Sequence, residues 1–365
     1  MRIVIASSFV PFVRGGGRFI VDWLEEKLQA HGHQVEKFYL PSDERPEVLL
    51  DTLLAYRLMV AAEGADRLIA IRPPAHLLQH PDKIVWFIHH MRGYYDLAHT
   101  EHSSVPPSAE GRALREALVR VDTAGLVEAR KIFTNSRVVS DRLKTFNGLD
   151  SEVLYPPLFD VSGFRFDGAN DEIVTVCRVE PHKRQELLIR AMARVKTGVR
   201  LRICGASANP GYETQLKSLV REQGLENRVT LEFGWITDER KAELINSCLA
   251  SVYAPHDEDS YGYPTLEAAS ARKATVTASD SGGTLEFIEN GRNGLIAEPT
   301  PEAFAAAFDA LFANRPATRL MGEAAHETVG RLKISWDHVV EQMTAPHASE
   351  PVSRPPHALA GTAVR

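Results

Sequence analysis

The residues best suited to chemistry lie in segment 253–268, where an acid-rich loop leads into the start of a predicted helix. The preceding run, 249–253, predicts a buried strand, Gly262 permits close approach of the backbone to a ligand, and Pro264 suits a first helical turn. A helix that begins there offers unpaired N–H groups and the positive end of its dipole to a diphosphate. The segment therefore predicts a binding site for an activated sugar, with an ordinary strand–loop–helix connection as the alternative.

Two carboxylates eight positions apart bracket this turn. Asp259 stands at its mouth, and Glu267 lies within the predicted helix, where it could hold a ribose. We expect the remaining contacts to an activated sugar to come from Glu258, Tyr261, Gly262, Tyr263, Pro264, Thr265 and Leu266.

Two cations follow another predicted buried strand. Arg178 comes directly after the run 172–177, and Lys183 opens the next helix, so both can point into a cleft. A diphosphate leaving group gains negative charge as a glycosidic bond breaks, and fixed cations stabilise that transition state more than the ground state. We expect a catalytic role for both, with solvated surface cations as the simpler alternative.

Three consecutive glycines, Gly15, Gly16 and Gly17, separate the first predicted strand from the first predicted helix. Because they carry no Cβ atoms, their backbone N–H groups can lie against a ligand at the helix N-terminus. The spacing is not that of a dinucleotide fingerprint, since Gly-x-Gly-x-x-Gly fails at its last position. We expect the turn to contact the sugar donor, with a merely flexible turn as the alternative.

Strand pattern in 83–88 ends at His89, which places an imidazole at the edge of the sheet that faces the cleft. We expect His89 in the catalytic site, and we expect Arg92 and Asp96 to shape the acceptor site. A nucleotide base is expected near Gly205 and Trp235. Farther along the chain, Glu286 could approach the nucleotide, or it could satisfy backbone donors at a helix start.

These residues require a framework in which the ends of several strands converge. Apolar runs alternate with amphipathic stretches, which is typical of doubly wound α/β sheets. The predicted strands lie at 2–6, 34–38, 67–71, 83–88 and 131–133, and again at 172–177, 199–204, 229–233, 249–253 and 274–278. We therefore expect two Rossmann-like domains, 1–160 and 161–330, that face each other across a cleft. Residues 331–345 predict a last helix, and 346–365 predict a disordered tail.

Composition excludes some classes of function. The 365 residues carry a net charge of −6, and the charges are spread along the chain, so no polybasic arm indicates nucleic acid. No apolar run is long enough to span a bilayer and no signal peptide opens the chain, which predicts a cytoplasmic location. Cys177, Cys204 and Cys248 match no metal-binding spacing and are expected to be core residues.

Taken in chain order, these motifs resemble those of the family 4 (group 1) retaining glycosyltransferases of the GT-B fold. The resemblance rests on 15–17, His89, Thr134-Asn135-Ser136, Tyr155-Pro156-Pro157, Arg178 with Lys183, Asp259 with Glu267, and 282–294. It implies an acceptor-binding first domain, a second domain that binds a nucleotide diphosphate sugar, and no metal requirement. It also implies that the last helix, around Trp336, packs on the first domain.

Carried over by position, the resemblance assigns the diphosphate to Arg178 and Lys183 and the ribose to Glu267. The family pattern has two glutamates that flank seven residues, and here the first falls on Asp259, with Glu258 one step earlier. Either Asp259 reaches the sugar from a shifted backbone, or Glu258 takes its role.

The resulting hypothesis is a retaining hexosyltransferase that needs no metal and no cofactor beyond its nucleotide diphosphate sugar, with UDP and GDP both open. Its acceptor would be a carbohydrate or a lipid-linked sugar in cell-surface polysaccharide or lipopolysaccharide synthesis. A lipid-linked acceptor would bring the protein to the inner face of the cytoplasmic membrane. Two alternatives stay open, namely a nucleotide-sugar 2-epimerase of the same fold and a non-catalytic sugar-nucleotide binding protein.

Overall fold

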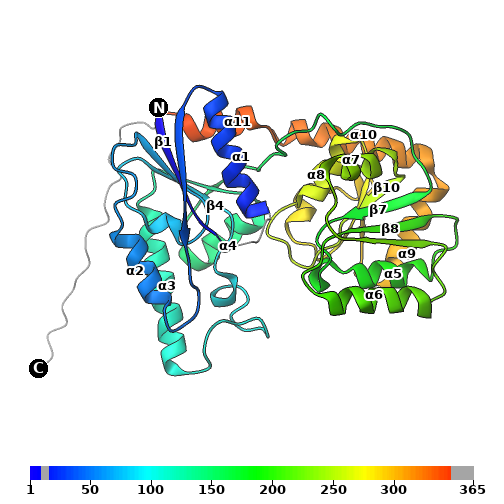
Figure 1. The fold of residues 1–365 in the computed structure, drawn as a ribbon, viewed down its shortest axis with the longest axis horizontal. Coiled ribbons are helices and arrows are strands. Elements are labelled where there is room, and N and C mark those ends of the chain that lie inside the picture. Colours follow the sequence, from blue (N-terminus) through cyan, green and yellow to red (C-terminus); the bar gives the residue numbers. More distant parts are fainter. Residues whose placement is uncertain (10–15, 347–365) are drawn as a thin grey trace, which may run out of the picture.

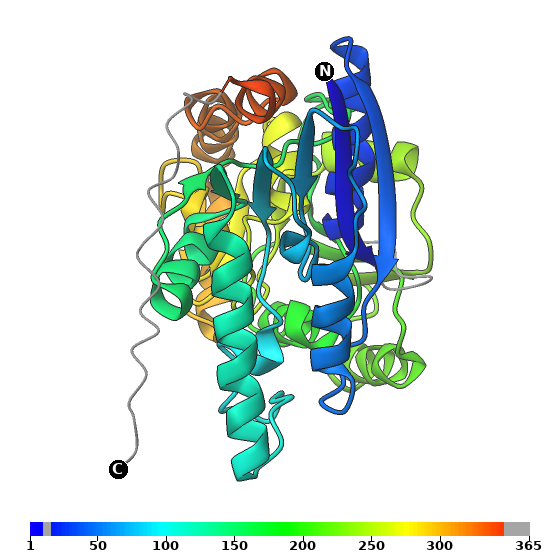
Figure 2. The ribbon, with the colours of Figure 1, turned by 90° about the vertical axis from the view of Figure 1, so that its left-hand side faces the viewer.

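The computed structural model describes residues 1–9 and 16–346, which form two α/β domains side by side (Figure 1). Each domain is built on a six-stranded sheet. Neighbouring strands run parallel in both sheets, and helices lie on both faces of each sheet (Figures 1 and 2). The predicted pair of doubly wound sheets is therefore confirmed. Gly15 and the predicted tail beyond Pro346 lie outside the described residues.

The first sheet has the strand order β2-β1-β3-β4-β5-β6. Its strands are β1 (Arg2–Phe9), β2 (Gln34–Pro41), β3 (Arg67–Ala70), β4 (Lys83–Phe87), β5 (Lys131–Thr134) and β6 (Glu152–Val153). Its helices are α1 (Gly16–Ala30), α2 (Leu49–Leu58), α3 (Ala109–Val127) and α4 (Arg137–Asn147), with short 3₁₀ turns η1 (Ala75–Leu77) and η2 (Arg92–Tyr94).

The second sheet has the strand order β12-β11-β10-β7-β8-β9. Its strands are β7 (Glu172–Val176), β8 (Arg200–Gly205), β9 (Val229–Phe233), β10 (Ala250–Val252), β11 (Thr275–Ala278) and β12 (Gly294–Ala297). The helices of this half are α5 (Gln185–Met192), α6 (Pro210–Glu222), α7 (Asp238–Ser247), α8 (Tyr263–Ser270), α9 (Pro301–Ala313) and α10 (Arg315–Arg331). The 3₁₀ turns η3 (Pro181–Lys183) and η4 (Gly283–Glu286) and the final helix α11 (Trp336–Thr344) complete the chain as described.

Burial explains why these segments form their elements. Every residue of β3 and β4 is buried, as expected for inner strands of a parallel sheet that is covered on both faces. The apolar stripe of α1, which includes Ile20 and Leu24, packs on one face of the first sheet. The helix α11 returns to the first domain and packs against α1, so Trp336 and Val339 join the same core.

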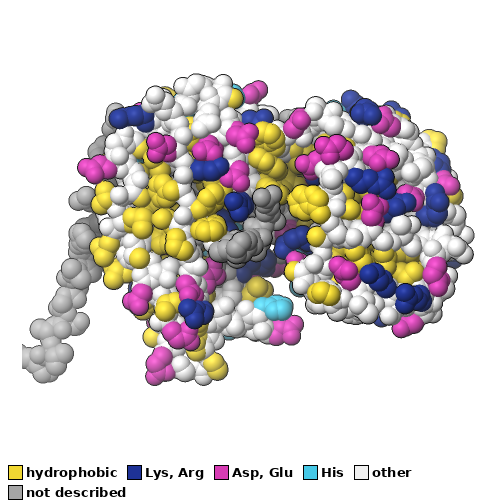
Figure 3. All heavy atoms as spheres, in the orientation of Figure 1, with side chains coloured by type: hydrophobic (Ala, Val, Ile, Leu, Met, Phe, Trp, Pro, Cys, Tyr) yellow, Lys and Arg dark blue, Asp and Glu magenta, His cyan; other side chains and the backbone are white. Residues whose placement is uncertain are grey.

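The strand orders determine where a ligand site can form. The order reverses between β1 and β3 in the first sheet and between β10 and β7 in the second. Open α/β sheets bind ligands beyond the carboxyl ends of their strands at such reversals. Basic side chains gather where the two domains meet (Figure 3). A ligand site is therefore expected at the loops that follow β3, β4, β7 and β10.

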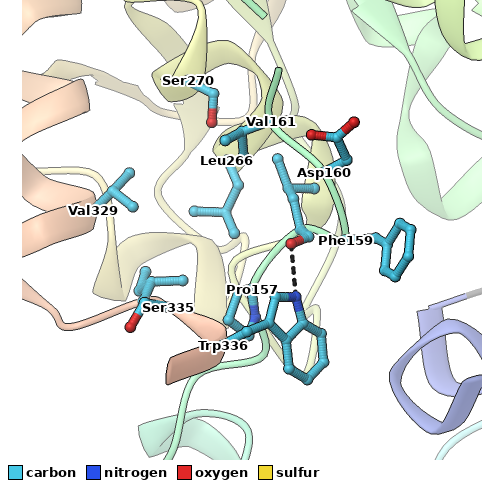
Figure 4. Close-up of a pocket in the computed structure, with 11 residues that line it drawn as sticks. Pro157, Phe159, Asp160, Val161, Leu266, Ser270, Val329, Ser335 and Trp336 are labelled. Carbon is cyan, nitrogen blue, oxygen red and sulfur yellow. Dashed lines mark hydrogen bonds between the residues drawn. The ribbon is translucent and has the colours of Figure 1, made fainter. Parts of the chain in front are cut away.

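The segment that follows β6 and leads into the second domain also helps to hold the domain junction together. The Trp336 indole N–H donates to the carbonyl of Leu158 at 2.8 Å (Figure 4), and the Tyr261 hydroxyl donates to the carbonyl of Pro156. A pocket of about 270 Å³ opens here, with Phe159, Leu266 and other mainly apolar residues in its wall. It lies at the junction and contains none of the acid-loop residues.

Candidate active site

The acid loop joins the carboxyl end of β10 to α8, beside the neighbouring strand β7. At Gly262 the backbone φ is +71°, and a Cβ atom would lie 2.3 Å from Cε1 of Tyr253, so this position requires glycine. Pro264 occupies the first turn of α8, as predicted. Gly282 packs against the loop from the other side, because its Cβ would lie 2.4 Å from the carbonyl oxygen of Glu258.

Lys183 and Glu258 form a partly buried ion pair near the carboxyl ends of β7 and β10. Lys183 ends η3, is 7% exposed, and donates from Nζ both to the Glu258 carboxylate and to the Tyr253 hydroxyl, the latter at 2.8 Å. The Tyr253 hydroxyl also donates to Glu258 at 3.1 Å. Burial alone would raise the pKa of Glu258, but Lys183 and Tyr253 hold it below the usual value. This wall of the cleft therefore holds a fixed cation whose anionic partner comes from the acid loop.

Asp259 belongs to a different network, which joins the two domains. Its carboxylate pairs with Arg142 of α4, and Arg92 lies 3.5 Å away. The N-cap residue of α4, Ser136, donates its hydroxyl to the carbonyl of Asp259. Burial raises the pKa of Asp259 to about 6, against the opposing effect of the two arginines.

The same two arginines also bind Asp257. Arg92 meets the Asp257 carboxylate at 2.5 Å and Arg142 meets it at 2.8 Å, while Arg92 pairs with Asp96 at 2.7 Å. We call Arg92, Asp96, Arg142, Asp257 and Asp259 the interdomain charge cluster. The structure thus places Arg92 against the acid loop and Asp96 beside Arg92, and their predicted contact with an acceptor stays a prediction.

Glu267 lies on α8, where it is 5% exposed. One carboxylate oxygen accepts from Nζ of Lys241 on α7 at 2.7 Å, and Lys241 also pairs with Asp238 at 3.0 Å. Burial raises the pKa of Glu267, and Lys241 opposes that rise. Near the same helix start, the hydroxyl of Thr265 is buried and has no partner among the described residues.

The first domain contributes the glycine turn and His89. Gly16 and Gly17 open α1, and a Cβ at Gly16 would lie 3.3 Å from the ring of Tyr263. Tyr263 also packs edge-on against Trp23 of α1, so α8 and α1 meet directly. These contacts bring Gly16 close to the start of α8, and the predicted contact of the glycine turn with a sugar donor stays a prediction.

His89 lies two residues after β4, with both ring nitrogens engaged. Nδ1 is 2.7 Å from the carbonyl of His90, and Nε2 is 3.3 Å from Nε of Arg72. Burial and the charge of Arg72 lower the pKa of His89 to about 4, so the ring is neutral at pH 7. The only tautomer that satisfies both contacts carries its proton on Nδ1 and accepts from Arg72 at Nε2.

The other residues predicted to contact the donor differ in their exposure and packing. Arg178 is 54% exposed in its side chain and pairs with Glu180 at 2.9 Å, so it remains able to turn toward a ligand. Trp235 is 74% exposed. Gly205 is required for packing, since a Cβ there would lie 1.8 Å from the carbonyl oxygen of Cys177.

Tyr261 and Leu266 point into an apolar core at the domain junction. Both side chains are almost fully buried, so only their backbone can meet a donor. For Glu286 the sequence left two alternatives, a contact with the nucleotide and the capping of a helix start, and the structure shows a helix cap. Glu286 accepts from the backbone N–H groups that open α4, those of Arg137 at 2.8 Å and Val138 at 2.9 Å, and therefore caps a helix of the other domain.

Sequence reasoning missed three cations of this site: Arg72, Arg142 and Lys241. Helix α4, which carries Arg142, was not identified, and the acid-loop partners of Arg142 lie 115 and 117 positions farther along the chain, whereas Glu267, a partner of Lys241, lies on the next helix. No group of three or more His, Cys, Asp or Glu side chains within 1–9 and 16–346 is arranged to hold a metal ion. In that part of the chain, no helix combines the length and the apolar character that crossing a membrane requires.

A comparison with family models matches residues 162–328 to the glycosyl transferases group 1. The matched segment carries Lys183, the acid loop and Glu267. Residues 162–328, which make up the second domain, belong to the group 1 glycosyltransferases. The prediction of nucleotide-sugar glycosyl transfer is thereby confirmed, and nothing indicates an epimerase.

Named relatives of this glycosyltransferase extend over both domains. It is 26% identical to the alpha-1,3/1,6-mannosyltransferase ALG2 of Homo sapiens over 326 residues, which are 80% of this chain and 75% of the relative. It is 28% identical, over 63% of each chain, to the GDP-mannose-dependent alpha-(1-6)-phosphatidylinositol monomannoside mannosyltransferase of Mycobacterium tuberculosis.

Solved structures of other proteins share the fold of this glycosyltransferase. Sucrose-phosphate synthase from Thermosynechococcus elongatus superposes with a TM-score of 0.73 at 19% identity and covers 93% of this chain and 97% of its own. Anabaena HepE in complex with UDP gives a TM-score of 0.71 at 16% identity, over 94% and 98%. These likenesses confirm the GT-B fold.

Proposed function

We propose that this glycosyltransferase retains anomeric configuration and moves a hexose from a nucleotide diphosphate sugar to a carbohydrate or lipid-linked acceptor. The observation that carries the proposal is the buried Lys183, which faces the acid loop at the strand reversal of the second sheet. In the absence of donor its charge is balanced by Glu258, and a diphosphate is a stronger partner for the same ammonium group.

Donor binding then proceeds by exchange of ionic partners. The diphosphate takes Lys183 from Glu258, and Arg178 turns from Glu180 to join it. The carboxylate of Glu258 is released beside the sugar, where it accepts a hydrogen bond from a sugar hydroxyl. Glu258 rather than Asp259 fills this role, because Asp259 is held by Arg142 in the interdomain charge cluster.

The chemical step uses the leaving group itself. Lys183 and Arg178 stabilise the charge that grows on the diphosphate, and the loss of one such contact would raise the barrier by about 3–4 kcal/mol. The leaving phosphate accepts the proton of the incoming hydroxyl on the same face of the sugar, so configuration is retained. Glu267, fixed by Lys241, receives the ribose hydroxyls. Because the chain's own cations meet the diphosphate, activity should persist in excess EDTA.

Mannose is the first sugar to test, because two named relatives are mannosyltransferases and one is GDP-mannose-dependent. The second relative acts on a phosphatidylinositol-based acceptor by name, which supports a lipid-linked acceptor and action at the inner face of the cytoplasmic membrane. A role in cell-surface polysaccharide or lipopolysaccharide synthesis is part of the same proposal.

The test incubates purified protein with GDP-mannose, UDP-glucose and UDP-N-acetylglucosamine, with and without glycolipid acceptors. Released nucleotide is quantified, and the anomeric configuration of the product is read by NMR. An α-linked product from an α-linked donor supports the proposal. An inverted product, or a C2 epimer of the donor sugar, would contradict it.

A further inference from the structure

Arg72 is a cation of the first domain that the donor site does not use. It lies two residues after β3, at the carboxyl edge of the first sheet, between the glycine turn and the end of β4. Its side chain is mostly buried, and its stem packs tightly against the turn, since a Cβ at Gly17 would lie 3.3 Å from Cδ of Arg72. The glycine at position 17 therefore makes room for this arginine.

Arg72 differs from the other semi-buried arginines near the cleft in its partners. Arg92 and Arg142 each contact at least two carboxylates. Within 1–9 and 16–346, the one hydrogen bond that Arg72 makes joins its Nε to Nε2 of His89 at 3.3 Å, and no ion pair is formed. The charge of Glu44 acts on Arg72 from a distance, but burial outweighs it and lowers the arginine pKa.

A guanidinium in this position is suited to one class of ligand. Arginine stays charged, and burying an uncompensated charge is costly, so a bound anion would stabilise the site. His89 accepts from Nε and thereby orients the group, which leaves Nη1 and Nη2 for a ligand. Two parallel N–H donors fit two oxygens of a phosphate.

Because Arg72 lies on the first domain, an anion bound there would belong to the acceptor rather than to the sugar donor. The donor diphosphate belongs to Lys183 and Arg178 on the second domain, whereas Arg72 stands on the opposite wall. A Cβ at Gly16 would lie 3.3 Å from the ring of Tyr263 on α8, and a Cβ at Gly17 would lie 3.3 Å from Arg72, so the start of α1 separates Arg72 from α8.

We propose that Arg72, oriented by His89, binds a phosphate group of the acceptor, either in a lipid headgroup or in a soluble sugar phosphate. This inference rests on the proposed function, since it names the acceptor class of the same enzyme. It makes His89 a positioning residue for Arg72.

The experiment uses full-length protein saturated with GDP or UDP, whichever binds, so that the donor site is filled. Inorganic phosphate is then titrated by calorimetry into the wild type, Arg72→Gln, Arg72→Lys and the control Arg120→Gln, an exposed residue of α3. We expect saturable binding to the wild type, at least a tenfold loss in Arg72→Gln, a partial loss in Arg72→Lys, and no change in Arg120→Gln. Melting temperatures of all four proteins verify that they are folded.

Three results would overturn the inference. They are no phosphate binding by the wild type, unchanged binding by Arg72→Gln, and a tenfold loss of nucleotide affinity in Arg72→Gln, which would assign Arg72 to the donor. Failure of the proposed function looks different, because the protein would then release no nucleotide from any sugar donor while phosphate binding persisted.

Two further probes identify the source of the phosphate. Mannose 1-phosphate represents a soluble acceptor, and phosphatidylcholine vesicles that contain phosphatidylinositol represent a lipid headgroup. Binding of either probe that depends on Arg72 supports the inference and selects that source. If neither probe binds in an Arg72-dependent way, the inference is wrong.

Discussion

The contact between Arg142 and Asp259 can be measured as a coupling free energy. The two side chains are 14% and 21% exposed, so the pair lies between a surface ion pair and a fully buried one. Removing one partner of a buried pair costs about 3–5 kcal/mol, and exposed pairs contribute about 0.2–1 kcal/mol. Because Arg92 remains 3.5 Å from Asp259 after Arg142 is removed, we expect Arg142→Gln to cost about 2 kcal/mol.

The assay is a double-mutant cycle with Arg142→Gln, Asp259→Asn and the double variant, followed by urea unfolding at pH 7.5. We expect a coupling energy of about 1–2 kcal/mol. Lys144 and Asp150 provide the matched control, since Lys144 lies on the same helix and the pair is 56% and 88% exposed at 2.9 Å. Its coupling should stay below about 0.5 kcal/mol. A coupling for Arg142 and Asp259 no larger than this control would refute the interdomain charge cluster.

Three further outcomes test separate parts of the site. The pKa of His89 is lowered to about 4 from 6.5, so the unfolded chain takes up a proton at this residue before the folded protein does. The contribution of His89 to the free energy of unfolding is therefore fully present above pH 6.5 and is lost as the pH falls toward 4. At about 1.36 kcal/mol per pH unit the loss is about 3 kcal/mol. Urea unfolding at pH 7, 5.5 and 4.5 should show a steeper loss for the wild type than for His89→Gln, and parallel curves would contradict this. In thermal unfolding, Gly262→Ala should destabilise the protein by about 1–3 kcal/mol more than Gly148→Ala does. Both residues have a φ of +71°, but only at Gly262 would the added Cβ clash, with the ring of Tyr253. Equal losses in the two variants would refute the clash. Trp235→Ala should leave stability within about 0.5 kcal/mol and weaken nucleotide binding about tenfold if the indole stacks on the base, and unchanged nucleotide affinity would remove it from the site.

Much of the fold follows from the sequence because parallel strands that are buried on both faces leave long apolar signals. The predicted strands at 67–71, 83–88 and 172–177 match β3, β4 and β7 to within one residue. Helix α2 was missed. Its apolar residues do not form one stripe, and Leu54 and Leu58 are exposed in the structure.

The predicted site residues also fall into two groups, those that the sequence can predict and those that it cannot. Positions fixed by local backbone geometry, such as Gly262 and Pro264, can be derived from the segment that contains them. Ionic partners cannot, because a carboxylate in the sequence gives no sign of which cation it will meet. Glu258 and Asp259 are adjacent, yet they pair with cations of different domains, Lys183 and Arg142.

Glu286 illustrates the same limit. Its sequence context suggested either a nucleotide contact or a helix cap, and the structure shows a cap on α4, whose first residue lies 149 positions earlier. The chain folds so that an acid of the second domain satisfies backbone donors of the first. Only the arrangement of the two domains decides between such alternatives.

The assignment of the donor site is tested most directly at Lys183. Transfer from the nucleotide sugar should be compared in the wild type, Lys183→Met and Lys183→Met/Glu258→Gln, where the second substitution removes the carboxylate that the first leaves unpaired. We predict that both variants fold and that both lose about 10²–10³-fold in kcat, because the cation at the leaving diphosphate is gone in each. Transfer at the wild-type rate by the folded double variant would contradict the assignment of the donor site.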